Sequence, residues 1–178
     1  FEPEGVALIG ASADPKKNTG RPQRYLSAHG YGGRIYPINP GRPEVQGLKA
    51  YASAADIDGP VDHAFIMVPS DAVGEAIVSC GRANIPLATI YSDGFAETGS
   101  AGQAKQETLI GIARGAGVRI LGPNSMGVIC PASRLTLSVN AVLEMPDLPK
   151  GRLGLVSQSG TILGMLLSRG AARGIGFS

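Results

Sequence analysis

The sequence has few of the residues that build metal centres and disulfide frameworks. Its 178 residues include two cysteines, Cys80 and Cys130, and two histidines, His29 and His63. The cysteines form no Cys-x-x-Cys pair and lie at no metal-ligand spacing from a histidine, so the sequence predicts no metal site. Because unpaired cysteine is among the most frequently buried residues, we expect two buried free thiols. Free thiols are typical of a reducing cytosol, and we therefore expect a cytoplasmic protein.

Long apolar runs and long basic runs are also missing. No apolar run reaches the roughly 18 residues of a membrane-spanning helix, so we expect no membrane segment. The net charge is only +2, and no basic run is long enough to indicate nucleic-acid binding. The sequence begins without methionine, and an apolar run is just starting where it stops at 174–178. We therefore expect a piece of a longer protein.

Glycine and proline are abundant, with 26 and 13 residues in a chain that is 43% hydrophobic. This composition favours many tight strand–loop–helix junctions over disorder. The first junction organises the rest: four apolar residues end in Gly10 and Ser12, which is typical of a buried parallel strand that leads into a phosphate-binding turn. Thr19 as N-cap and Pro22 in the first turn predict that a helix follows, so the loop should offer backbone N–H groups to an anion. The Gly-x-Gly-x-x-Gly fingerprint is only partly present, which leaves a purely structural turn as the alternative.

Apolar segments with strand character alternate with helical patterns along the next hundred residues. Strands are predicted at 6–9, 34–39, 61–68, 87–91 and 118–121, and helices at 22–28, at 102–116 and from a cap at Ser70 or Asp71 to about Arg82. Alternation of this kind predicts an α/β fold with right-handed crossovers, that is, a Rossmann-like, doubly wound parallel sheet. Pro37 inside the second strand indicates that part of this segment lies at the edge of the sheet or at a strand end. His29 at a helix end and His63 at the start of a strand are expected to be structural.

Polar loops follow the predicted strands, at the edge of the sheet where doubly wound folds bind ligands. The second strand leads to Arg42 and not to the acidic residue that binds the ribose of NAD. A cation at this place favours a ligand with a phosphate on its ribose, such as NADP or coenzyme A, and a solvated surface arginine is the alternative. The loops that should converge here contain Ser12, Arg42, Pro69, Ser92 to Gly94, and Gly122 to Asn124.

The strand–helix rhythm breaks at residues 131–150, which have no clear period and are expected to cross from a first domain, 1–130, to a second, 151–178. The second unit is predicted to contain a strand at 151–156 and an apolar helix from Thr161 to about Ala172. Between them, Ser157 and Ser159 place hydroxyls at the positive end of the helix, which favours an anion there. Neither serine fits the Gly-x-Ser-x-Gly elbow of a serine hydrolase.

Six short motifs in this order resemble the N-terminal part of the nucleoside-diphosphate-forming acyl-CoA synthetases. That family includes ADP-forming acetate–CoA ligases and, more distantly, the alpha subunit of succinyl-CoA synthetase. The motifs are Gly10-Ala11-Ser12, Asn39-Pro40, Val68-Pro69, Gly94-Phe95-Ala96-Glu97, Gly122-Pro123-Asn124 and Ser157-Gln158-Ser159-Gly160. The resemblance covers essentially the whole chain. It implies a CoA-binding Rossmann-like domain followed by the first βα unit of a flavodoxin-like ligase domain.

The resemblance also implies two groups of site residues. The CoA-binding group consists of Gly10, Ser12, Lys16, Arg42, Pro69, Ser92, Asp93 and Gly94. The second group would hold a phosphate or acyl phosphate, with a helix start at the Gly-Pro-Asn motif and a helix-end cradle for a phosphorylated histidine. It consists of Gly122, Pro123, Asn124, Ser157, Ser159 and Gly160.

By the same resemblance, the family joins a small carboxylic acid, CoA and ATP through acyl-phosphate and phosphohistidine intermediates. The phosphorylated histidine lies further along in the family, and neither His29 nor His63 has its setting, so no catalytic residue is expected in this sequence. ATP or ADP with Mg²⁺ would bind at an ATP-grasp domain or subunit that is absent here. The resemblance therefore implies an acid–thiol ligase that is inactive as this piece alone, with a homo-oligomer left open.

Two other functions stay open at this point. The same region resembles the ligase-like part of some bacterial protein acetyltransferases, where it would be a CoA-sensing regulatory module. An NADP-binding Rossmann redox module would also fit Lys16 and Arg42, although no Tyr-x-x-x-Lys pair or other hydride-transfer group is visible.

Overall fold

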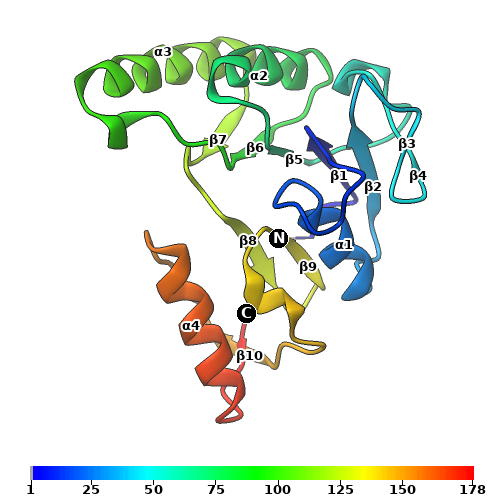
Figure 1. Ribbon diagram of the computed structural model, residues 1–178, viewed down its shortest axis with the longest axis vertical. Helices are drawn as coiled ribbons and strands as arrows, with labels where there is room; N and C mark the ends of the chain where they lie inside the picture. Colours follow the sequence, from blue (N-terminus) through cyan, green and yellow to red (C-terminus); the bar gives the residue numbers. More distant parts are fainter. Residues whose placement is uncertain (1) are drawn as a thin grey trace.

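The computed structural model describes residues 2–178. Its centre is a sheet of five strands in the order β2-β1-β5-β6-β7, and every neighbouring pair is parallel (Figure 1). The strands of this sheet are β1 (Gly5–Ile9), β2 (Arg34–Ile38), β5 (His63–Ile66), β6 (Leu87–Ile90) and β7 (Arg119–Leu121). The predicted α/β fold with a doubly wound parallel sheet is confirmed.

Each of the five predicted strands is present. Four of them agree with the prediction to within one residue at each end, whereas the third is shorter and spans 63–66 in place of 61–68. The prediction that Pro37 marks an edge is also confirmed, because β2 is the outermost strand and Pro37 is paired with Leu8 of β1.

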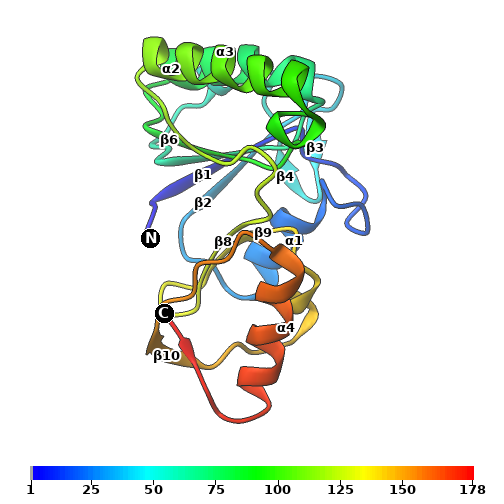
Figure 2. The ribbon, with the colours of Figure 1, turned by 90° about the vertical axis from the view of Figure 1, so that its left-hand side faces the viewer.

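The two faces of the sheet are covered by different kinds of element (Figures 1 and 2). On one face, α2 (Val73–Arg82) and α3 (Ser100–Ala116) bury the side chains of Ala7, Ile9 and Ile66. On the other face, Val6, Leu8 and Phe65 pack with α1 (Arg21–Ala28) and a two-stranded hairpin. The alternation of β1 residues between the two clusters is the period of two that a strand buried on both faces requires.

Residues 131–150 contain regular elements that the sequence did not predict. The strands of the hairpin are β8 (Gly127–Cys130) and the antiparallel β9 (Leu135–Ser138), and the short turn η4 (Ala141–Glu144) follows. Leu135 and Leu137 are fully buried beside Leu26 of α1. Strand β9 is only four residues long, and its polar residues Thr136 and Ser138 are buried as well. So short a segment shows no clear hydrophobic period in the sequence. Its burial depends on packing against α1, which is distant in the chain.

Two predicted helix caps are wrong. The N-cap of α1 is Gly20 and not Thr19. Position 20 requires glycine, because a Cβ there would lie 2.0 Å from the Asp14 carbonyl oxygen. The helix after β5 begins with the 3₁₀ turn η2 (Ser70–Ala72), so Ala72 is the N-cap of α2. The Asp71 carboxylate pairs with Lys105 of α3 and does not cap the helix.

An exposed glycine in helix α3 offers a site at which a substitution should stabilise the protein. Gly111 lies in the helix interior, and a Cβ there would meet nothing within 4 Å. We expect Gly111→Ala to raise the free energy of unfolding by about 0.5–1 kcal/mol, because alanine loses less backbone entropy in a helix. Gly117 is the control: it ends α3 at φ +72°, where alanine is strained and should destabilise by roughly 1–2 kcal/mol. Urea unfolding of both variants measures the change in the free energy of unfolding. Changes of the same sign in the two variants would contradict the prediction.

The last strand and helix lie at the end of the molecule opposite α2 and α3 (Figure 2). They are β10 (Lys150–Leu153) and α4 (Gly160–Ala171), and a small core of Tyr25, Val142, Leu143 and Leu167 joins α4 to η4 and α1. No helix in residues 2–178 is long and apolar enough to cross a membrane.

The remaining elements are short and lie in the connections. They are the antiparallel pair β3 (Glu44–Val45) and β4 (Leu48–Lys49) and the 3₁₀ turns η1 (Ala54–Asp56) and η3 (Ala96–Thr98).

Candidate functional site

The strand order places a topological switch between β1 and β5. The chain leaves β1 for β2 on one side and returns to β5 on the other, so the loops after β1 and β5 diverge at this point. Gly10 ends β1 with φ +87°, and a Cβ there would lie 3.1 Å from the backbone of Met67. The loop that follows β1 therefore lies directly against the end of β5, at the place where open α/β sheets bind ligands.

The loop after β1, residues 12–20, is closed by its own hydrogen bonds. The Ser12 amide donates to the Thr19 carbonyl at 3.1 Å, and the Ser12 hydroxyl accepts from the Asp14 amide at 3.1 Å. The Lys16 amide donates to the Asp14 carboxylate at 2.9 Å. These three amides are used within the loop, and Pro22 contributes no N–H to the first turn of α1. The positive charge of the loop comes from the exposed Lys16 side chain and its neighbour Lys17.

The end of β2 is tied to the same loop. The Asn39 side chain donates from Nδ2 to the Ala11 carbonyl at 2.9 Å, and its Oδ1 accepts from the Gly41 amide at 3.0 Å. The Arg42 amide donates to the Asn39 carbonyl at 3.2 Å, which places Arg42 in the turn that Asn39 organises. Arg42 is exposed. Two cationic segments, one after β1 and one after β2, are therefore neighbours at this edge.

The loops after β5, β6 and β7 are joined by Ser92. Its buried hydroxyl donates to the Val68 carbonyl, and its own carbonyl accepts from the Asn124 amide at 2.9 Å. Gly94 turns the chain at φ +88°, close to the Ser70 hydroxyl. Pro69 and Asp93 are exposed on either side of this junction. Ser92 therefore holds these loops together at one edge of the sheet.

Residues 122–124 do not begin a helix, contrary to the prediction. Asn124 has φ +54°, and the Ser125 amide donates to the Ile90 carbonyl at 3.0 Å. The segment therefore bonds along the edge of the sheet and leads into β8 at Gly127. Helical bonds to carbonyls four residues earlier do not form, because these amides are used by β6 and the loop that follows it.

The serine motif at the start of α4 contacts Met126, which follows the Gly-Pro-Asn motif by two residues. Ser159 is the N-cap of α4, and its hydroxyl accepts from the Ile162 amide at 3.3 Å. Ser157 accepts from the Ser159 amide at 3.1 Å. Gly160 touches Met126, because a Cβ at position 160 would lie 1.9 Å from the Met126 sulfur. The start of α4 therefore lies against Met126, two residues after the Gly-Pro-Asn motif, and the anion cradle stays a prediction.

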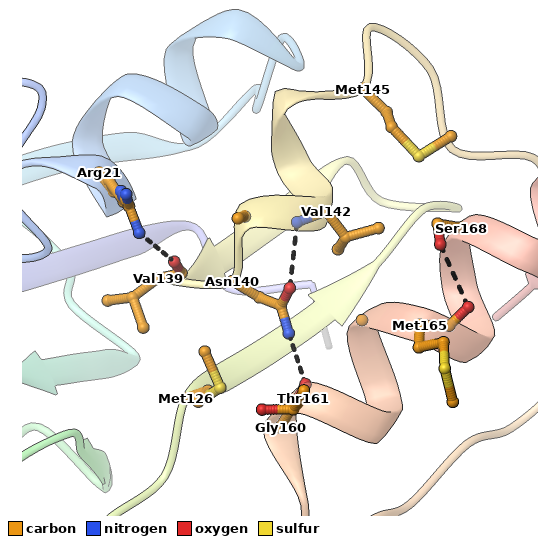
Figure 3. Close-up of a pocket in the computed structure, with 12 residues that line it drawn as sticks. Arg21, Met126, Val139, Asn140, Val142, Met145, Gly160, Thr161, Met165 and Ser168 are labelled. Atoms are coloured by element: carbon orange, nitrogen blue, oxygen red, sulfur yellow. Dashed lines mark hydrogen bonds between the residues drawn. The ribbon is translucent and has the colours of Figure 1, made fainter.

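A groove of about 570 Å³ runs beside this cradle, along α4 and against the first turn of α1 (Figure 3). Asn140 fixes one wall: it donates to the Gly160 carbonyl at 2.8 Å and accepts from the Val142 amide at 3.0 Å. The Arg21 guanidinium faces the groove, and its buried Nε has no hydrogen-bond partner among the described residues. The groove offers one cation and mostly apolar walls, including Met126, Met145 and Met165.

The two histidines and the two cysteines lie outside this site. The His63 ring is buried and pairs with the Thr89 hydroxyl at 2.7 Å, and His29 ends α1 with a contact of 2.9 Å to the Leu143 carbonyl. Both are structural, as predicted. Cys80 is buried, and burial raises the pKa of its thiol to about 12. Cys130 is only half-buried, which differs from the prediction, because β8 lies near the surface.

Four residues of the site region carried no signal in the sequence. Gln46 contacts the loop after β1, Met126 contacts α4, Asn140 holds the start of α4, and Arg21 faces the groove. Each acts on a segment far away in the sequence, so no local spacing could identify it.

The chain is similar to several known proteins. Residues 4–131 match the CoA binding domain family. The chain is 37% identical over its full length to the acetate–CoA ligase [ADP-forming] II subunit alpha of Pyrococcus furiosus, of which it covers 38%. It is 39% identical, over 91% of its length, to the corresponding I subunit alpha, of which it covers 35%. A solved structure, the Ca. Korarchaeum cryptofilum dinucleotide forming acetyl-coenzyme A synthetase 1 in its apo form, superposes on the whole chain with a TM-score of 0.92 at 36% identity, and the chain covers 38% of it. The chain therefore spans little more than a third of the length of these proteins.

Proposed function

Since the chain belongs to the CoA binding domain family, we propose that it binds coenzyme A at the carboxyl edge of its parallel sheet. The observation that carries this proposal is the pairing of two exposed cationic segments, at Lys16 and Arg42, beside the topological switch. CoA carries a 3′-phosphate on its ribose and a pyrophosphate, so it needs cations at two places. Gly10, Ser12, Pro69, Ser92, Asp93 and Gly94 would shape the path of the ligand between them.

We further propose that the chain is the CoA-binding part of an ADP-forming acid–thiol ligase, which makes acyl-CoA from a carboxylic acid, CoA and ATP. The names of the similar proteins support this activity. In this chain, Ser157, Ser159 and Gly160 would receive a phosphoryl group at the positive end of α4, opposite the loop of Gly122, Pro123 and Asn124. The groove beside Arg21 is where the carbon chain of the acid would lie.

The whole enzyme would need parts beyond this chain. An ATP-grasp domain or subunit would bind ATP and Mg²⁺, and a histidine elsewhere would carry the phosphoryl group, since His29 and His63 are both engaged in the fold. A cytoplasmic location fits two cysteines that are not paired with each other. A homo-oligomer is compatible with this proposal. The CoA family match disfavours an NADP redox module, and the ligase names of the relatives disfavour a regulatory module.

Titration with CoA and dephospho-CoA tests the proposed site. We expect Arg42→Ala to weaken CoA binding about tenfold, because a charge-assisted bond to the 3′-phosphate contributes about 1.4 kcal/mol at a partly exposed site. Binding of dephospho-CoA should change less than twofold. The control is Arg114→Ala, which removes an exposed positive charge from the end of α3. Calorimetry at low and moderate salt gives the affinities.

Three results would contradict the proposal. Equal affinity of the unaltered chain for CoA and dephospho-CoA would show that the 3′-phosphate is not bound. Equal losses of CoA affinity in the Arg42 and Arg114 variants would show that only the net charge of the protein matters. Binding of NADP without CoA would favour the redox module.

A further inference from the structure

Gln46 adopts a backbone conformation that its side chain does not favour. It occupies the two-residue turn between β3 and β4 with φ +46°, and Gly47 follows with φ +81°. Turns with two positive φ values favour Asn-Gly, because asparagine tolerates the left-handed region and glycine has no Cβ. A glutamine in the first position is strained, so contacts elsewhere must offset the strain.

The contacts that offset it are made to the loop after β1. The Gln46 side-chain amide donates both of its hydrogens, one to the Ser12 carbonyl at 2.8 Å and one to the Gly20 carbonyl at 3.0 Å. Ser12 and Gly20 are the two ends of the closed loop 12–20. One side chain thus joins the ends of the segment that carries Lys16.

The turn that carries Gln46 is itself fixed to α1. The buried side chain of Gln23 donates from Nε2 to the Val45 carbonyl at 2.7 Å. The Ala50 amide donates to the Pro43 carbonyl at 2.9 Å, which closes the hairpin a few residues after Arg42. The segment that begins at Arg42 therefore reaches the Lys16 loop through Gln46.

These contacts also have an electrostatic consequence. A carbonyl oxygen carries partial negative charge and repels a phosphate that approaches it. The Ser12 and Gly20 carbonyls each accept one amide hydrogen of Gln46 and are therefore turned toward the hairpin. With most amides of the loop used internally, its attraction for an anion depends on where the lysine side chains and the carbonyls point. Gln46 fixes the direction of the Ser12 and Gly20 carbonyls.

We propose that Gln46 is a positioning residue for CoA, which holds the Lys16 loop closed at a fixed distance from the Arg42 segment. The proposal rests on the proposed CoA-binding function and adds a residue that the sequence motifs do not contain. Gln46 acts through the loop and does not touch the ligand.

Gln46→Gly separates this role from general stability. Glycine relieves the strain at φ +46° and removes both hydrogen bonds, so the midpoint of thermal unfolding should stay within a few degrees while the CoA dissociation constant rises about five- to tenfold. Gln46→Glu keeps the size of the side chain but cannot donate when ionised, and it should lose at least as much affinity. Gln103→Ala, which removes an exposed amide from α3, is the control and should leave CoA binding unchanged.

Hydrogen exchange supplies a readout that does not need the ligand. In Gln46→Gly, amides of residues 12–20 should exchange faster, while those of β1 exchange as in the unaltered chain. CoA affinity within twofold of the unaltered chain, with or without faster exchange, would overturn the proposed role of Gln46. Failure of the unaltered chain to bind CoA would instead overturn the proposed function, and the role of Gln46 in binding with it.

Discussion

Replacing Gly20 by alanine is expected to lower the free energy of unfolding by about 3 kcal/mol and to weaken CoA binding at least tenfold. The new Cβ would lie 2.0 Å from the Asp14 carbonyl oxygen and 2.9 Å from its carbon. Both are backbone atoms of the loop after β1, so no flexible side chain can move aside. The backbone of Gly20, at φ −98° and ψ −22°, suits any residue, and the whole effect is therefore steric.

The loss of affinity has its own cause. Relief of the clash displaces Asp14 and opens the loop, which separates the Gly20 carbonyl from Gln46 and moves Lys16. The control is Gly32→Ala, at an exposed position where a Cβ would meet nothing within 4 Å. Urea unfolding and CoA titration measure both variants. Unaltered stability of Gly20→Ala would show that the loop is not closed as described.

Acidification from pH 6.5 to pH 4 is expected to lower the free energy of unfolding by about 3 kcal/mol through His63 alone. Burial lowers the pKa of His63 to about 4, whereas an exposed histidine titrates near 6.5. The folded chain thus binds the proton less well than the unfolded chain between these values. The stability that the neutral ring provides is complete above pH 6.5 and is lost as the pH falls toward 4.

The test compares acid unfolding of the unaltered chain with that of His63→Gln, which keeps a polar group near Thr89 but has no proton to gain. The difference in unfolding free energy between them should change steadily from pH 7 to pH 4. Acidic groups such as Glu144, whose pKa Arg24 and Tyr25 lower to about 2, contribute equally to both chains and cancel. His29→Gln removes the other histidine and should leave the steep loss in place. A constant difference between the unaltered chain and His63→Gln would contradict the assignment.

The candidate site was predictable where its residues act through their own neighbours in the chain. Gly10 at the end of a strand and Ser159 at the start of a helix were both identified, because a strand end and an N-cap are local features. The cap of α1 was misplaced at Thr19, because the close approach of Asp14 to Gly20 is a property of the folded loop. The prediction of a helix at Asn124 was wrong for the same reason, because the Asn124 amide donates to the carbonyl of the distant Ser92.

The sequence by itself determined the parallel sheet of this protein and the loops at its carboxyl edge. A strand that is buried on both faces needs a short run of apolar residues, and such a run can be recognised within a few residues of sequence. Only the tertiary structure decided that a hairpin covers the second face, that Met126 contacts Gly160 and that Gln46 bonds both ends of the loop after β1. These contacts join residues far apart in the chain, and their free energy depends on a geometry that exists only once the sheet has formed.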